Sequence, residues 1–170
     1  FGNFENVINW ENNGYEVKEY ATYLYKSYTR TVKNIPYFFK EALTWSLISS
    51  SKFGARLMPH GFIIGDAGPT CYPHSSIKLE LLAFMNTKIC KWMLDIMNPT
   101  LNFSPGVLKN IPFDSISSDF IKMIVNNQID IAKSEWDSRE TSWDFKANQL
   151  VISNEELVID NPIRENPCSS

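Results

Sequence analysis

The chain has 170 residues, 44% of them hydrophobic, and a formal net charge of −3 at pH 7. This apolar content is enough for one folded domain and excludes a largely disordered chain. No apolar run approaches the ~20 residues that a membrane-spanning helix needs, and no signal peptide is evident, so we expect a soluble, cytoplasmic protein without a membrane partner. The chain begins at Phe1 rather than Met, which we interpret as a piece of a longer protein.

Charge is distributed unevenly along the chain. Residues 18–56 carry seven basic and two acidic side chains, whereas residues 110–170 carry five basic and eleven acidic ones. Such an asymmetry indicates a polyanion-binding face in the first half. A solvated surface of uneven charge is the plainer alternative.

Side chains suited to metal binding or acid–base catalysis do not form a cluster in the sequence. The cysteines are Cys71, Cys90 and Cys168. They form no Cys-x-x-Cys pair, which favours free thiols over a zinc site. Neither His60 nor His74 has a neighbouring cysteine, so a surface position is favoured for both. Asp66 has no second carboxylate near it, which favours a turn-stabilising role.

The first half of the chain predicts a hairpin, a helix and two strands. Residues 7–18 are a predicted β-hairpin, because Asn13-Gly14 supplies the positive φ angles of a tight turn. Residues 19–34 place tyrosine and leucine at helical spacing, which predicts a basic, aromatic helix that Pro36 ends or bends. Residues 37–48 and 61–65 are predicted strands.

The second half predicts two long helices. Residues 77–97 repeat an apolar side chain every three or four positions, which predicts one helix that Pro99 ends. Residues 119–136 predict the second, with Ser118 as its N-cap. Ser153 and Glu156 have the spacing of a capping box, and residues 146–170 form an acidic C-terminal extension that we expect to be partly flexible. The fold class is therefore α+β: a mixed or antiparallel sheet with a β-hairpin near the N-terminus and two long helices packed on it.

Two short motifs resemble the Asn-Pro-Pro-Tyr motif with which amino-methyltransferases hold a flipped base. They are Asn34-Ile35-Pro36-Tyr37 and Asn110-Ile111-Pro112-Phe113. In both, isoleucine replaces the first proline, and the segment that precedes the first motif is too short for a cofactor domain. The repetition favours coincidence, so we assign no catalytic residue and no cofactor to this chain.

Two polar segments favour contact with DNA. The segment from Lys40 to Arg56 supplies hydroxyl and cationic groups that bond phosphates and base edges, and the loop of residues 100–109 supplies a second set. Trp45 could stack on a base, although a core position is commoner for such a residue. The candidate DNA-binding residues are Lys26, Arg30, Lys33, Lys40, Thr44, Trp45, Ser46, Ser49, Ser50, Lys52, Arg56, Thr100, Asn102, Ser104 and Lys109.

An ordered series of motifs gives the chain a family resemblance from about Val7 to Phe145. It includes Leu43-Thr44-Trp45-Ser46, Leu81-Leu82-Ala83-Phe84-Met85-Asn86-Thr87-Lys88 and Trp136-Asp137-Ser138-x-Glu140-Thr141-Ser142-Trp143-Asp144-Phe145. The series resembles the C-terminal part of the PglX/BrxX adenine-specific DNA methyltransferases of BREX phage-defence systems. It is more loosely similar to the TaqI-like specificity domain of restriction–modification enzymes. Target-recognition domains usually read Leu-Asn-Ser-Lys at residues 85–88, and we expect the change here to keep the helix.

The resemblance implies a non-catalytic fragment of a larger enzyme. The parent would transfer a methyl group from S-adenosylmethionine to adenine N6 through an N-terminal Rossmann-like domain. Residues 1–145 would form the DNA target-recognition domain, in which a sheet-and-loop face enters the major groove of double-stranded DNA and a long helix packs behind it.

The acidic third of the chain leaves two further hypotheses open. Because acidic helices repel DNA, residues 119–145 would face away and dock on the parent's methyltransferase domain or on another BREX protein. The alternative function is therefore a protein–protein docking module, and a third is a DNA-mimicking surface. Exposed apolar residues on the helix of residues 119–136 would favour docking, whereas a continuous basic cleft from residues 18–56 would favour DNA reading.

Overall fold

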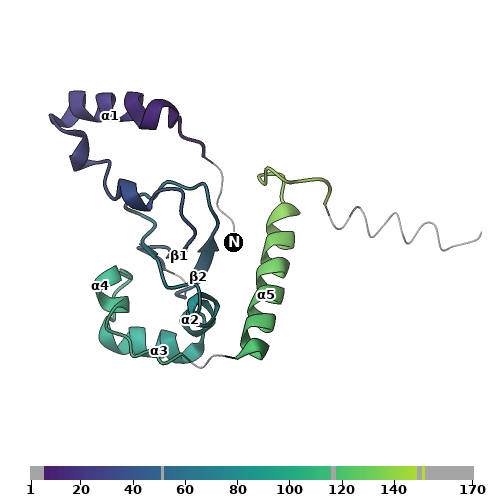
Figure 1. Ribbon diagram of the computed structural model, residues 1–170. Helices are drawn as coiled ribbons and strands as arrows, with labels where there is room; N and C mark the ends of the chain where they lie inside the picture. Colours follow the sequence, from purple (N-terminus) through teal and green to yellow (C-terminus); the bar gives the residue numbers. More distant parts are fainter. Residues whose placement is uncertain (1–5, 51, 116–117, 149–150, 152–170) are drawn as a thin grey trace, which may run out of the picture.

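A small antiparallel sheet lies at the centre of the computed structural model, which describes residues 6–50, 52–115, 118–148 and 151. The strands are β1 (Ala42–Trp45), β2 (Ala55–Met58) and β3 (Thr70–Cys71), in the order β2-β1-β3. The helices are α1 (Glu11–Tyr25), α2 (Lys78–Met85), α3 (Lys88–Met97), α4 (Pro105–Leu108) and α5 (Asp119–Asp137). In Figure 1, α1 lies at one end of the molecule, α3 and α4 lie at the other, and α5 runs along one side. The α+β class and the antiparallel sheet are confirmed.

The register of the sheet separates an apolar face from a polar one. Thr44 of β1 lies opposite Arg56 of β2 and Thr70 of β3. Directly opposite residues of antiparallel strands share one face, so these three polar side chains lie on the same side of the sheet. The alternate residues Leu43 and Trp45 belong to the core on the other side.

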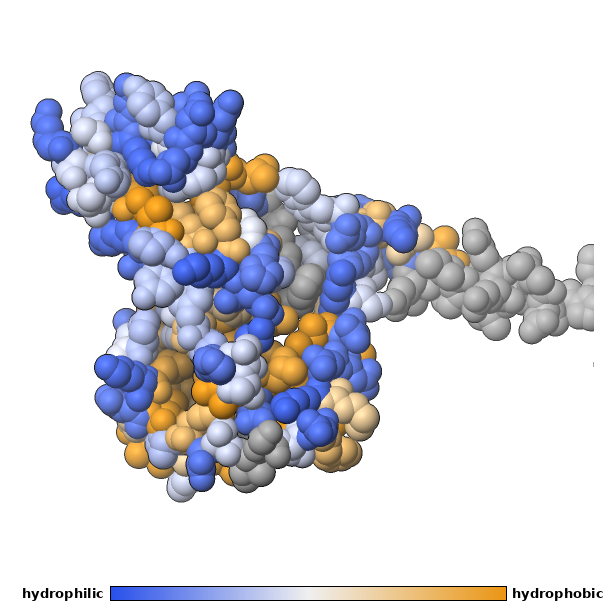
Figure 2. Space-filling model, in the orientation of Figure 1, coloured by the Kyte–Doolittle hydropathy of each residue, from blue (hydrophilic) through white to orange (hydrophobic). Residues whose placement is uncertain are grey.

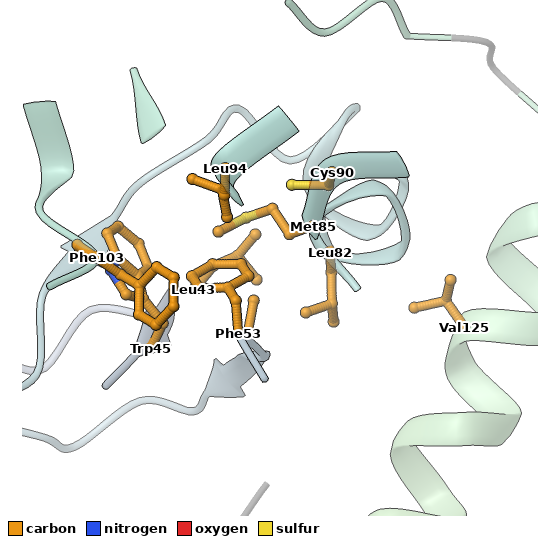
Figure 3. Packing of buried hydrophobic residues seen from close by; sticks show 10 residues of the cluster. Leu43, Trp45, Phe53, Leu82, Met85, Cys90, Leu94, Phe103 and Val125 are labelled. Atoms are coloured by element: carbon orange, nitrogen blue, oxygen red, sulfur yellow. Dashed lines mark hydrogen bonds between the residues drawn. The ribbon is translucent and has the colours of Figure 1, made fainter. Parts of the chain in front are cut away.

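The core fills the space between the apolar face of the sheet and the helices that follow it (Figure 3). Leu43, Cys90 and Leu94 are fully buried. Burial of one leucine side chain contributes about 1.5–3 kcal/mol to folding. Burial also raises the pKa of the Cys90 thiol to about 11, so that it stays protonated at neutral pH. In Figure 3, Val125 reaches this cluster from α5, which packs against α2.

The predicted hairpin of residues 7–18 is wrong, because residues 11–18 form the first part of α1. Asn12, Asn13 and Gly14 do have positive φ angles, of 49°, 58° and 70°, as the Asn-Gly signal required. These angles form a left-handed turn within the start of the helix instead of joining two strands. The ring of Trp10 packs over Gly14 and meets Phe38 edge-on at 5.2 Å, which ties this turn to the chain before β1.

Replacing Gly14 with alanine should lower the free energy of unfolding by about 1–2 kcal/mol, the usual cost of holding a residue with a Cβ atom in the left-handed conformation. The φ here is +70°, and an added Cβ would lie 2.7 Å from a carbon of the Trp10 ring. Gly65→Ala is the matched control, because nothing lies within 4 Å of its added Cβ. Urea unfolding followed by Trp fluorescence measures both variants, and equal stabilities would contradict the packing described here.

The helix predicted for residues 19–34 lies further toward the N-terminus. It ends at Tyr25, and Lys26 takes the left-handed conformation at its C-cap. Two 3₁₀ turns follow, η1 (Tyr28–Arg30) and η2 (Ile35–Tyr37). Pro36 lies inside the second turn, so it helps to start that turn instead of ending the helix.

The predicted strands were only partly correct. The segment 37–48 contains β1 but forms a strand over Ala42–Trp45 alone, and residues 61–65 are not a strand. Gly61, with a φ of 98°, lies in the turn that follows β2. β1 instead pairs with β2 and β3. The sequence of β2 contains no β-branched or aromatic residue and therefore gave no strand signal.

The helix predicted over residues 77–97 is two helices that meet at Asn86 and Thr87. Thr87 caps α3, because its hydroxyl oxygen accepts a hydrogen bond from the Cys90 backbone N–H at 3.1 Å. The expectation that the Met85-Asn86-Thr87-Lys88 sequence keeps one helix is therefore wrong. The helix predicted over residues 119–136 is confirmed as α5, with Ser118 at the N-cap position but without a side-chain capping bond. The predicted capping box at residues 153–156 lies outside the described residues.

No helix in the described part of the chain is both long enough and apolar enough to cross a membrane. Among the same residues, no group of three or more His, Cys, Asp or Glu side chains is placed to hold a metal ion.

Candidate nucleic-acid interface

The polar face of the sheet continues into a hollow beside the end of β1. The hollow has a volume of about 270 Å³, and its polar lining comes from Ser46, Ser49, Lys52 and Arg56. The rings of Phe53 and Phe103 contribute apolar walls and pack on each other at 5.1 Å between centroids. Hydroxyl and cationic groups over an aromatic base form a surface suited to phosphates and base edges.

Two loops far apart in the sequence build this hollow together. Ile48 pairs with Asn102 in an isolated antiparallel bridge. The Ser49 backbone N–H donates to the Leu101 carbonyl at 3.1 Å, and the Phe103 N–H donates to the Leu47 carbonyl at 2.7 Å. Parts of the two polar segments that the sequence predicts separately, 40–56 and 100–109, therefore lie side by side.

The two cations of the hollow have no carboxylate partner among the described residues. The ion pairs among the described residues use other side chains. Glu41 pairs with Lys78 and His60, one pair lies within α3, one lies within α5, and one joins α5 to Arg139. Lys52 is exposed, and Arg56 is half-buried with one guanidinium nitrogen 3.3 Å from the Ser46 hydroxyl. The positive charge is therefore available to an external anion.

The other predicted residues of this region have differing surroundings. Thr44 donates its hydroxyl to the Pro69 carbonyl at 3.0 Å, which holds it against the β3 side of the sheet. Thr100 and Asn102 are exposed in the second loop, where the Thr100 hydroxyl bonds Asn98 at 2.8 Å. Ser50, Ser104 and Lys109 lie in the same two loops or at the ends of α4.

Trp45 belongs to the core and not to the interface. It exposes only 2% of its surface, and its indole N–H donates to the Phe103 carbonyl at 2.7 Å. Figure 3 shows its ring beside Phe53 and Phe103 within the cluster. Of the two roles that the sequence left open for Trp45, the structure supports the core role.

The remaining predicted cations lie away from the hollow. Lys26, Arg30 and Lys33 follow α1 at its end of the molecule, and Lys40 precedes β1, whereas the hollow begins after β1 (Figure 1). Two of these cations lie over aromatic rings: Arg30 over Tyr25 at 5.4 Å and Lys40 over Tyr37 at 5.6 Å. Such contacts attract a cation to the face of the ring. The predicted basic residues thus divide into a pair at the hollow, a group that precedes β1, and Lys109 at the end of α4.

Sequence reasoning missed the residue that holds the hollow against α2. The Asn86 side chain accepts a hydrogen bond from the Ala55 N–H at 3.1 Å and donates to the Ala55 carbonyl at 3.1 Å. It also donates to the Leu82 carbonyl at 2.9 Å. Ala55 lies on the edge strand next to Arg56, so Asn86 fixes the strand that carries the half-buried cation. The apolar period of residues 77–97 continues through Asn86, so the sequence gave no local signal for this role.

A second surface of the molecule is apolar. Figure 2 shows exposed apolar side chains over the lower part of the molecule, where α3, α4 and one end of α5 lie in Figure 1. The exposed large apolar side chains of α3 and α5 are Ile89, Trp92, Ile96, Met97, Phe120, Met123, Ile124 and Ile131. A groove of about 370 Å³ lies between α5, β2 and α2, and Arg56, Leu57, Leu82 and Ile129 are among its lining residues.

The chain is similar to a part of two bacterial adenine-specific methyltransferases. It is 32% identical over 154 residues to the adenine-specific methyltransferase BrxX of Escherichia coli O9:H4 (strain HS). It is 31% identical over 157 residues to the adenine-specific methyltransferase PglX of Lacticaseibacillus casei (strain Zhang). A comparison with models of known protein families finds no match.

The two alignments cover 89% and 90% of this chain but only 12% and 13% of the relatives. The similarity to these two proteins therefore extends over nearly the whole chain. The chain nevertheless corresponds to a small part of each relative, and the alignments do not assign a role to that part.

Proposed function

We propose that this chain is the DNA target-recognition part of a larger N6-adenine methyltransferase and is non-catalytic by itself. The observation that carries the proposal is the hollow on the polar side of the sheet, where Lys52 and Arg56 have no ion-pair partner among the described residues. An adenine-specific methyltransferase must distinguish its target sequence, and hydroxyl and cationic side chains on a sheet-and-loop face can do so. The proposed recognition domain is residues 1–145, followed by the acidic extension of residues 146–170.

The charge distribution supports one orientation on double-stranded DNA. The hollow and the cations after α1 would meet phosphates, while α5 would face away because four of its six charged side chains are acidic. S-adenosylmethionine would bind elsewhere in the parent enzyme, which would act in a BREX-type phage-defence system in the cytoplasm. The parent's methyltransferase domain is then the nearest protein partner.

Fluorescence anisotropy with random-sequence duplex DNA tests the proposal. Binding should weaken steeply between about 50 and 200 mM salt, because each phosphate contact releases counterions. Simultaneous replacement of Lys40, Lys52 and Arg56 by alanine should lower the slope of log affinity against log salt by about one unit for each of these side chains that contacts a phosphate.

The matched control removes three cations from the acidic half by replacing Lys122, Lys133 and Lys146 with alanine. It changes the net charge equally and should leave most of the slope unchanged. Equal loss in both triple variants would mean that net charge and not a defined face controls binding. Absence of binding at about 50 mM salt, where phosphate contacts are strongest, would move the docking hypothesis to first place.

The alternative function, a protein–protein docking module, is favoured by the exposed apolar side chains of α5. Phe120 and Met123 expose 65% and 60% of their surfaces. Exposed apolar side chains of this kind are expected for a helix that docks on another protein surface. Co-purification with the separately expressed remainder of the methyltransferase tests this function. Met123→Glu should abolish the association, because Met123 lies on the exposed apolar face of α5. Lys133→Glu, an exposed position on the same helix but off that face, should not.

A further inference from the structure

Arg56 differs from every other cation of the proposed interface in how firmly it is held. It extends from strand β2, whose register with β1 sets Arg56 opposite Thr44. Its guanidinium donates to the Ser46 hydroxyl at 3.3 Å, and the side chain is half-buried. Lys52, by contrast, is exposed in the connection between the strands. One cation is oriented by the fold, and the other is free to follow an anion.

The surroundings of Arg56 favour recognition of a base over recognition of a phosphate. The major groove of B-DNA admits a two-stranded β-ribbon, and β1 and β2 form such a ribbon with Arg56 on its polar face. A side chain on that face, such as Arg56 on the edge strand β2, can approach base edges, while cations in the flanking loops approach the phosphates on either side. Phosphate contacts need charge alone, whereas base reading needs a fixed direction of hydrogen bonding.

The chemistry of the guanidinium identifies the base. Its planar group carries five N–H donors and no acceptor, so it can donate two parallel hydrogen bonds to the O6 and N7 acceptors of guanine. No other base presents two acceptors on that edge. Because Ser46 engages one nitrogen, the plane of the group is set before DNA arrives, which reduces the entropy lost on binding.

We propose that Arg56 reads one guanine in the major groove and that Ser46 is the positioning residue that holds the guanidinium in the reading plane. This inference rests on the proposed DNA-recognition function and adds the base class and the side chain that reads it. Lys52 then contributes affinity without sequence preference.

Selection of bound sequences from a random duplex library tests the inference with the full chain. The wild type should enrich a motif that contains a guanine. Arg56→Lys should reduce the preference at that one position by about 10-fold or more and leave the salt slope unchanged, because the charge is kept but the bidentate geometry is lost. Ser46→Ala should weaken the same preference less. Lys52→Ala should lower the salt slope by about one unit and leave the motif intact.

A second measurement changes the DNA base instead of the protein, and it does not depend on comparing the motifs that different variants enrich. Replacing the selected guanine by 7-deazaguanine removes the N7 acceptor, so it should weaken binding of the wild type and have little effect on Arg56→Lys. If Arg56→Lys keeps the full motif while the wild type is insensitive to 7-deazaguanine, Arg56 is not the reader. If the wild type enriches no motif although salt-dependent binding persists, sequence recognition itself fails and the inference fails with it.

Discussion

Replacement of Trp45 by alanine is expected to lower the free energy of unfolding by about 3–5 kcal/mol, the usual range for removal of a large buried aromatic side chain. Trp45 exposes 2% of its surface and contacts Phe53, at 6.4 Å between ring centroids. The substitution would also leave the Phe103 carbonyl without the indole N–H that it accepts. The cavity and the lost hydrogen bond both lower the stability, because Trp45 and Phe103 belong to the same core cluster.

The exposed Trp92 provides the control for this experiment. It exposes 65% of its surface on α3. Trp92→Ala should therefore change the stability by no more than about 0.5 kcal/mol, as surface substitutions usually do. Urea unfolding followed by far-ultraviolet circular dichroism measures both variants without relying on tryptophan emission. A loss below about 1 kcal/mol for Trp45→Ala, far under the range for a buried aromatic side chain, would contradict the core role and return Trp45 to the candidate interface.

Replacement of Asn86 by alanine is expected to destabilise the protein by about 2–3 kcal/mol despite the partial exposure of this residue. The substitution removes partners from both backbone groups of Ala55. A buried donor or acceptor left without a partner costs about 1–3 kcal/mol. The effect should extend to DNA binding, because Ala55 precedes Arg56 on the edge strand.

Two measurements separate these effects of Asn86→Ala. Urea unfolding gives the stability, and duplex binding at a temperature where the variant remains folded gives the affinity. Asn127→Ala, an exposed asparagine on α5, should change neither. Unchanged stability in Asn86→Ala would show that water replaces the amide at the edge of β2.

The sequence predictions succeeded where an element is fixed by residues close in the sequence, and they failed where it is fixed by residues far apart in the sequence. Helix α5 was predicted within one residue because its apolar spacing and N-cap position are local signals. The break between α2 and α3 was missed because the apolar period continues through Asn86, whose side chain turns to Ala55, 31 residues away. The Asn13-Gly14 signal correctly predicted positive φ angles, but the packing of Trp10 converted the expected hairpin into the start of a helix.

The candidate site was predictable in composition but not in arrangement. The two polar segments were identified by residue type, whereas their contact depends on the pairing of Ile48 with Asn102, which no local pattern encodes. Trp45 lies within the first segment and yet points into the core, since alternate residues of a strand face opposite sides. The separation of the cations at the hollow from those near α1 likewise depends on the tertiary fold, which the sequence pattern does not show.

The backbone bridge between the two loops has a consequence for how such a surface can change over generations. The bonds from Ser49 to Leu101 and from Phe103 to Leu47 use main-chain atoms only. Outward side chains such as Ser50 and Asn102 can therefore be exchanged while the loops keep their positions. Under the proposed DNA-recognition function, a few such surface substitutions would change the preferred DNA sequence at little cost to the stability of the loops.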